Sequence, residues 1–296
     1  MPPQSRSRCG DSGLAWPVDG SSGTHPEINQ DTVQLGETMD HSIRLGRVLF
    51  AIGMTALGLQ ALLRSSFVPA LEPVPAWVPQ LLLTWLGGLL LVAAGTAVLL
   101  GWKARQATMV LGLLLLLWLV LLHLPALAMH PHSGGEWTGA GETLALSGSA
   151  WVLAGVLDSG QSVRRSSDHL IDRAARAGRF CFGACLPLFG VLHFIYIDYV
   201  ASVIPGWIPG HVFWGYFTGA AHIAAGLAIV SGIRARLAAT LLGIMFGSWV
   251  LILHLPRVAV RLHDPNEWSS MLIATALCGG AWLIAGTLPW SKPATA

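Results

Sequence analysis

Long apolar stretches separated by short polar segments make up most of the chain after residue 43. The two clearest stretches, residues 81–102 and 107–128, each match the roughly 20 residues that a helix needs to cross a bilayer. They are rich in Leu, Ala and Gly and lack the alternation of polar and apolar residues found in membrane-spanning β-strands. Because backbone amides must be hydrogen-bonded inside a bilayer, this pattern predicts transmembrane helices.

Eight apolar segments, four in each half of the chain, are predicted to be helices. In the first half they cover residues 47–63, 81–100, 107–128 and 142–157, and in the second half residues 180–197, 213–230, 237–255 and 271–288. The expected fold is therefore an all-α polytopic membrane protein with eight transmembrane helices. Several segments are shorter than about 20 residues, so neighbouring helices or local thinning of the bilayer must accommodate them.

The two halves repeat the same phrases at a nearly constant spacing. "HLP" at His123 recurs at His254, and Trp137 recurs at Trp268, both at an offset of 131 residues (254 − 123 and 268 − 137). Such a repeat predicts two tandem four-helix bundles. Because four is an even number, both halves enter the bilayer from the same side, and we expect them to be related by a parallel pseudo-twofold axis.

The repeat divides the chain into five parts. We expect a disordered cytoplasmic tail at residues 1–43, a first repeat at 44–157, a cytoplasmic linker at 158–176, a second repeat at 177–289 and a cytoplasmic C-terminal tail at 290–296. The first 43 residues are rich in Ser, Gly and Pro and lack the apolar centre of a secretory signal peptide. The linker also suits a short amphipathic helix on the inner membrane surface.

Composition and charge agree with a membrane location. Hydrophobic residues make up 53% of the chain and charged residues 11%, against roughly 25% charged residues in soluble domains. Most Lys and Arg residues fall on one side of the predicted helices, so the positive-inside rule places both termini in the cytoplasm of a bacterial-type inner (plasma) membrane. The chain has no basic stripe, which argues against nucleic acid and leaves the lipid bilayer as the expected surroundings.

Three histidines of the second half are candidates for binding a cofactor. His193, His222 and His254 lie on three neighbouring predicted helices, where they can converge on a metal, a haem or a quinone carbonyl. Tyr196, near the outer end of the same helix as His193, completes the candidate set; its alternative role is to anchor the helix at the membrane interface. For His222 the alternative is a hydrogen bond to a neighbouring group, such as Ser248 or Thr218.

A divalent metal site is the second possibility, because each half places two histidines and a carboxylate near its predicted outer end. The candidate ligands are His123, His132, Glu136, His254, His263 and Glu267. The His and Glu of each i, i+4 pair share a face if the segment is helical, but two glycines and Pro265 argue against a helix there. In the alternative, His123 and His254 satisfy backbone oxygens next to a proline, and the loops are solvated between tryptophan anchors.

The motifs of the second half resemble those of a known family. "FGVLHF", "VIPGWIPG", "FWGYFTG", "AAGLAIVSGIRARLAA" and "LHLP" follow one another between residues 189 and 256. In this order they are similar to the DoxX-like family of four-helix membrane proteins, and the first half resembles a weaker second copy. The resemblance implies a four-helix bundle per half and an association with respiratory or thiol redox chemistry. One branch of the family is similar to the membrane subunit of a thiosulfate:quinone oxidoreductase.

These observations lead to three functional hypotheses. The first is an accessory or redox-associated membrane component that binds a quinone, haem or metal and serves a redox partner protein. The chain departs from thiol redox chemistry in having no paired-cysteine motif among its four cysteines. The alternatives are a small-solute or ion transporter, which the absence of paired mid-span Gly or Pro interruptions disfavours, and a structural or assembly protein without catalysis. The sequence assigns no catalytic residue.

Overall fold

The computed structural model describes residues 30–66, 68, 70–73, 79–157 and 168–288, and this part of the chain is helical apart from its short connections. The first half contains α1 (Gln30–Arg64), α2 (Gln80–Leu100), α3 (Ala104–Trp118), η1 (Leu119–His123), α4 (Leu124–Met129) and α5 (Gly134–Val156). The second half contains α6 (Asp168–Ile195), α7 (Ile197–Val203), α8 (His211–Ser231), α9 (Ala235–Trp249), η2 (Val250–His254), α10 (Leu255–Val260) and α11 (Pro265–Thr287).

Several predictions fall partly or wholly outside the described residues. These are residues 1–29 of the tail, residues 158–167 of the linker and the C-terminal tail at 290–296. Where the structure describes the predicted tail and linker, both are helical. α1 begins at Gln30, ahead of the expected start of the first repeat, and α6 begins at Asp168 and runs without a break into the apolar segment.

Within the described residues, seven helical segments are long and apolar enough to cross a membrane. They are α1, α2, α3 with η1 and α4, α6, α8, α9 with η2 and α10, and α11. The chain is thus an α-helical protein with the character of a multi-pass membrane protein. α5 is not among the seven, although it has 23 residues, because its sequence is rich in Gly, Ser and Thr.

The burial of α5 explains this composition. Its small residues, including Gly141, Ser147 and Gly148, are buried against neighbouring helices. A helix that is covered by protein does not need the apolar surface that lipid demands. Small side chains also let adjacent helices approach closely. The eighth predicted segment is therefore a helix, but a helix packed in the interior.

The last long helix of each half, α5 or α11, begins earlier than predicted. α5 starts at Gly134 and α11 at Pro265, whereas the apolar pattern predicts starts at residues 142 and 271. Ser133 accepts a hydrogen bond from Glu136 N (3.3 Å), and Asp264 accepts one from Asn266 N (2.9 Å). The expectation that glycines and Pro265 prevent a helix is wrong, because the proline occupies the first helical position, where its missing N–H has no cost.

Two π-helical segments, η1 and η2, interrupt the third long helix of each half. Each segment ends at a histidine that is followed by Leu-Pro. Pro125 and Pro256 have no N–H, and their rings would clash with the carbonyl four residues earlier. The backbone widens instead, so that Leu124 N donates to Leu119 O and Leu255 N donates to Val250 O. The helices therefore continue through the prolines.

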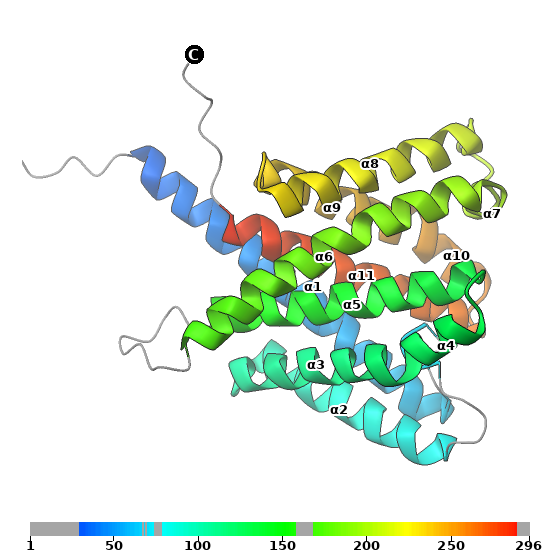
Figure 1. The fold of residues 1–296 in the computed structure, drawn as a ribbon, viewed down its shortest axis with the longest axis horizontal. Helices are drawn as coiled ribbons and strands as arrows, with labels where there is room; N and C mark the ends of the chain where they lie inside the picture. Colours follow the sequence, from blue (N-terminus) through cyan, green and yellow to red (C-terminus); the bar gives the residue numbers. More distant parts are fainter. Residues whose placement is uncertain (1–29, 67, 69, 74–78, 158–167, 289–296) are drawn as a thin grey trace, which may run out of the picture.

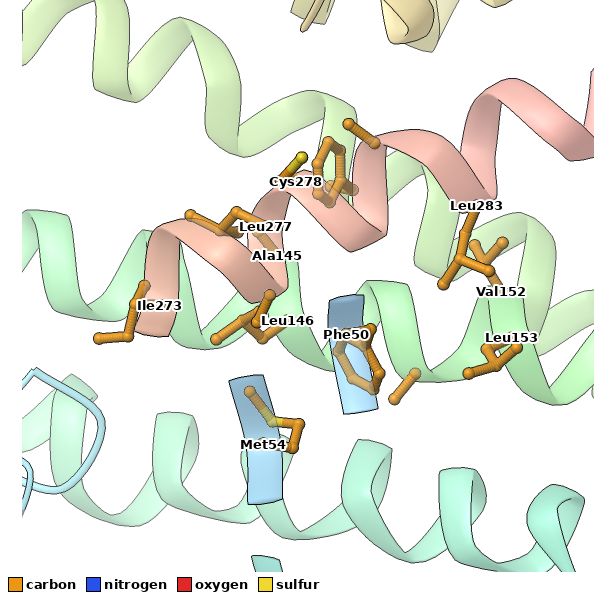
Figure 2. Packing of buried hydrophobic residues seen from close by; sticks show 14 of the residues in the cluster. Phe50, Met54, Ala145, Leu146, Val152, Leu153, Ile273, Leu277, Cys278 and Leu283 are labelled. Atoms are coloured by element: carbon orange, nitrogen blue, oxygen red, sulfur yellow. The ribbon is translucent and has the colours of Figure 1, made fainter. Parts of the chain in front are cut away.

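The helices of the two halves interlock at the centre of the molecule. α1 packs along α11, α5 packs along α6, and α5 and α11 also contact each other (Figure 1). Side chains from α1, α5 and α11, including Phe50, Leu146 and Leu277, meet in one cluster (Figure 2). Buried residues of both halves form a continuous core, so the halves share their inner helices instead of packing as two separate bundles.

Glycines set the closest helix contacts. A Cβ atom on Gly148 of α5 would overlap Gly178 O of α6. A Cβ atom on Gly279 of α11 would lie 2.7 Å from Gly46 O of α1. The two pairs correspond at offsets of 131 and 132 residues (279 − 148 and 178 − 46). Glycines at corresponding positions of the two halves therefore form the α5–α6 contact and the α1–α11 contact.

Candidate functional site

His193 and His222 come together in the second half. His193 lies on α6 and His222 on α8, and their ring centres are 5.0 Å apart with 47° between the planes. His222 is buried, with 1% of its surface exposed, and His193 is half-buried. The close approach of the two helices depends on Gly219, where a Cβ atom would lie 2.9 Å from His193 Cβ. The sequence prediction that these two histidines converge is consistent with this geometry.

Aromatic rings surround the histidine pair. The ring centre of Trp249 lies 5.3 Å from that of His222 and 6.1 Å from that of His193, with only 20° between the Trp249 and His193 planes. Phe246 and Phe189 lie 5.7 Å and 6.0 Å from His222. The imidazole nitrogens therefore lie among aromatic side chains. This arrangement is suited to a flat, largely apolar ligand.

Backbone hydrogen bonds fix the tautomer of both histidines. His193 Nδ1 lies 2.8 Å from Phe189 O, and His222 Nδ1 lies 2.9 Å from Thr218 O. Because a carbonyl oxygen only accepts, each Nδ1 must carry the proton, and each neutral ring then offers Nε2 as an acceptor. Thr218 is one of the two alternatives that the sequence suggested for His222, whereas Ser248 donates to Met245 O on its own helix.

His254 and Tyr196 lie apart from this pair. His254 ends η2 and is within electrostatic reach of Arg257 and Glu267. Tyr196 donates from its hydroxyl to His132 O at 2.9 Å, and its ring covers Gly134. In the described part of the chain, neither residue makes a ring contact or hydrogen bond with the pair. The structure thus brings together two of the four residues of the predicted cofactor set.

The first half does not contain a corresponding pair. Ala61 and Leu91 occupy the positions that align with His193 and His222, at offsets of 132 and 131 (193 − 61 and 222 − 91). His123, in contrast, is buried, and its Nε2 lies 3.1 Å from Leu71 O and 3.0 Å from Thr143 Oγ1. His123 thus forms a hydrogen bond with a backbone oxygen, as predicted for its alternative, structural role. The oxygen belongs to Leu71 in the α1–α2 connection and not to the helix of His123.

Glu267, a predicted metal ligand, is held by two arginines. Arg257 approaches both carboxylate oxygens, with distances of 2.9 Å to Oε1 and 2.8 Å to Oε2, and Arg261 Nη1 lies 3.0 Å from Oε1. Over the residues that can be described, no group of three or more His, Cys, Asp or Glu side chains is arranged to hold a metal ion. A metal at His132, Glu136 or His263 stays a prediction.

Glu72 is a buried carboxyl that the sequence pattern missed. It is 4% exposed, and it lies in a turn in which Leu71 N and Glu72 N both donate to Val68 O, at 2.8 Å and 2.9 Å. Burial raises the pKa of Glu72 from 4.5 to about 8. The available signal was an acidic residue within the apolar loop "VPALEPVP", at a position where the second half has no acid.

Comparison with protein-family models, with curated proteins and with solved structures finds no match to this chain. The DoxX-like resemblance therefore stays a prediction from short motifs, and a functional argument must start from the residues described above.

Proposed function

We propose that the protein is a multi-pass membrane protein of DoxX-like type that binds a hydroquinone ring at His193 and His222. In this role it is an accessory, redox-associated component of the membrane. The observation that carries the proposal is the pair of Nδ1 hydrogen bonds to backbone carbonyls, which leaves two Nε2 acceptors beside Trp249. A hydroquinone has two O–H donors on a flat ring, and it reaches membrane depth because it dissolves in lipid.

The geometry of the histidine pair also favours a hydroquinone over an oxidised quinone, a haem or a metal ion. An oxidised quinone presents carbonyl oxygens, which would face two acceptors, so the neutral pair favours the reduced form. Imidazole rings with centres 5.0 Å apart leave no space for a haem between them. A metal ion would need further ligands, and the rings around the pair are Phe189, Phe246 and Trp249.

Replacing either histidine by leucine should weaken hydroquinone binding about fivefold, because one hydrogen bond is worth roughly 1 kcal/mol. Binding is measured in detergent through quenching of tryptophan fluorescence, with a short-chain ubiquinol as the ligand. Tyr196→Phe is the control, since Tyr196 lies away from the pair. Equal affinity of His222→Leu and the wild-type protein, or no binding by the wild-type protein, would contradict the proposal.

We also propose that the chain consists of two tandem repeats and that α5 is an eighth span. Matching contacts at an offset of 131 residues support this. Trp137 Nε1 donates to Pro131 O (2.9 Å) and Trp268 Nε1 to Leu262 O (3.0 Å). Ser147 Oγ donates to Gly112 O (2.8 Å), as Cys278 Sγ does to Gly243 O (3.3 Å). η1 and η2 recur at the same offset.

The distribution of positive charge supports a plasma (inner) membrane protein with both termini in the cytoplasm. The helix ends opposite α4 and α10 carry Arg44, Arg47, Lys103, Arg105, Arg173, Arg176, Arg179, Arg234 and Arg236. The α4 and α10 end, where α7 also lies (Figure 1), carries Arg64, Arg257 and Arg261 among the described residues. We therefore propose that the α4 and α10 end faces outward.

Cysteine labelling tests this topology. In a variant whose native cysteines are replaced by alanine, Pro131→Cys and Leu262→Cys should react with an impermeant maleimide on intact cells. Trp102→Cys and Ile233→Cys should react only after permeabilisation. All four positions are exposed, and each pair is 131 residues apart (262 − 131 and 233 − 102). Labelling of positions 131 and 262 from opposite sides would overturn both the topology and the parallel repeat.

A second candidate function, a small-solute or ion transporter, is favoured by one observation. η1 and η2 interrupt corresponding helices of the two halves, and paired interruptions occur in many transporters. Substrate-dependent uptake into proteoliposomes would support this function over the first.

A further inference from the structure

The turn that contains Val68, Leu71 and Glu72 packs into the end of the first half at which α4 lies. Val68 and Leu71 are buried, with 2% and 0% of their surface exposed. His123 Nε2 bonds to Leu71 O, and Ala70 O lies 2.7 Å from the position that a Cβ atom on Gly139 would take. The turn is therefore fixed between η1 and α5. This fixed turn carries the carboxyl of Glu72 below the surface.

Among the described residues, the Glu72 carboxyl lies beside Gly87 and near the indole ring of Trp118. A Cβ atom on Gly87 of α2 would overlap Glu72 Oε1 and would lie 2.8 Å from Trp118 Cζ2 of α3. The carboxyl thus occupies the space left by the missing side chain of Gly87, beside the indole ring. A charged carboxylate in such surroundings loses its hydration without compensation, so the protonated form is favoured.

Glu267 provides a direct comparison. Both glutamates are 4% exposed, but Glu267 contacts two arginines whereas no ion pair with Glu72 is present in the described residues. Arg257 and Arg261 place two positive charges at Glu267, whereas no positively charged group contacts Glu72 among the described residues. The two carboxyls therefore differ in their partners and not in their burial.

A second atom of the same cluster is also able to accept a proton. His123 Nε2 must donate to Leu71 O, so the neutral ring has a lone pair on Nδ1. That Nδ1 atom is buried without a hydrogen-bond partner, and the His123 side chain is 1% exposed. The turn therefore carries a buried carboxyl and is bonded through Leu71 O to a buried imidazole.

We propose that Glu72 is a proton-binding site of the first half, whose buried carboxyl holds a proton beside Gly87 and Trp118. The ligand is a proton because Glu72 provides a single carboxyl, without the further oxygen ligands that a metal cation needs. This site lies in the opposite half from His193 and His222, so it does not depend on the proposed hydroquinone site.

Few other titratable or charged groups influence Glu72. The described outer parts of α2 and α3 contain none. The elements around the turn contribute Arg64 at the end of α1, His123 on η1, His130 and His132 after α4, and Glu136 and Glu142 on α5. Arg64 is engaged with the second half, where its Nη1 donates to His263 O at 3.2 Å. Because Glu142 is a second carboxyl in this part of the molecule, the contribution of Glu72 is measured as the difference between the wild-type protein and Glu72→Gln.

Stability should depend on pH in a defined direction. Below pH 4.5 Glu72 is protonated in both the folded and the unfolded chain and contributes no slope. Between pH 4.5 and about 8 the unfolded chain ionises while the folded chain keeps its proton, so the free energy of unfolding falls as pH rises. Above about pH 8 both forms are ionised and this contribution becomes constant. Glu72→Gln should remove this decline, so its melting temperature should exceed that of the wild-type protein most above pH 8.

Chemical modification tests the proton directly. Dicyclohexylcarbodiimide reacts with protonated carboxyls in apolar surroundings, and mass spectrometry identifies the modified residue. In the detergent-purified full chain we expect modification of Glu72 about two pH units below its pKa and about a hundredfold less modification two units above it. Glu267 is the matched control and should stay unmodified at both pH values.

Infrared spectroscopy provides a second measurement that does not depend on access of the reagent. The wild-type protein should show a protonated-carboxyl band that weakens as pH rises through the pKa of Glu72, and this band should be smaller in Glu72→Gln. The proposal is overturned if this band is the same in both proteins, or if Glu72 and Glu267 are modified to the same extent.

Discussion

Replacement of Gly148 by leucine should separate α5 from α6 and lower the free energy of unfolding by about 3 kcal/mol. A Cβ atom at this position already overlaps the backbone oxygen of Gly178, and a backbone atom cannot rotate away as a side chain does. The helices must therefore move apart, and the surrounding core loses contacts. Thermal unfolding of the detergent-purified protein measures the effect.

Gly206→Leu is the control for this substitution, because a Cβ atom at Gly206 has nothing within 4 Å. Its stability should match that of the wild-type protein. Gly46→Leu should be as harmful as Gly148→Leu, since Gly46 makes the equivalent contact with Gly279. If Gly148→Leu unfolds at the wild-type temperature, glycine packing does not hold α5 against α6.

Replacement of Arg257 by methionine should cost about 3 to 5 kcal/mol, because it removes the principal partner of a buried carboxylate. Arg257 contacts both oxygens of Glu267, and its own side chain is 29% exposed. Methionine has a similar length, so lost packing contributes little. The loss is again measured by thermal unfolding in detergent.

Arg261 provides the matched comparison for Arg257. It binds the same carboxylate at 3.0 Å, but its side chain is 63% exposed, so Arg261→Met should cost less than about 1 kcal/mol. Glu267→Leu combined with Arg257→Met should recover most of the stability, because no uncompensated buried charge remains. Equal losses for the two single arginine variants would show that burial does not govern this ion pair.

The apolar pattern predicted most of the helices because lipid imposes a simple rule on exposed spans. The rule failed where a helix is covered by protein. The predicted start of α5 is too late because the residues from Gly134 to Gly141 are mainly glycine and polar residues and lack the apolar pattern of an exposed span. The caps Ser133 and Asp264 carried the missing signal, since such residues commonly precede a helix.

The predicted site was recovered only in part, because sequence spacing does not define which helices are neighbours. His193 and His222 meet because α6 and α8 are consecutive long helices that pack against each other. Glu72 and its contact with Gly87 depend on how a loop folds back, and the partner arginines of Glu267 lie ten and six residues away. No period in the sequence marks such contacts. The interlocking of the two halves also had no local signal.

The pairing of α1 with α11 has a consequence for biosynthesis. α1 ends at Arg64 and α11 begins at Pro265, so 201 residue positions separate them (265 − 64). During translation the glycine-lined surface of α1 enters the bilayer long before its partner leaves the ribosome. Until then Gly46 and Gly53 must face lipid, another helix of the nascent chain or an insertase. The contact between α1 and α11 is thus among the last to form during synthesis.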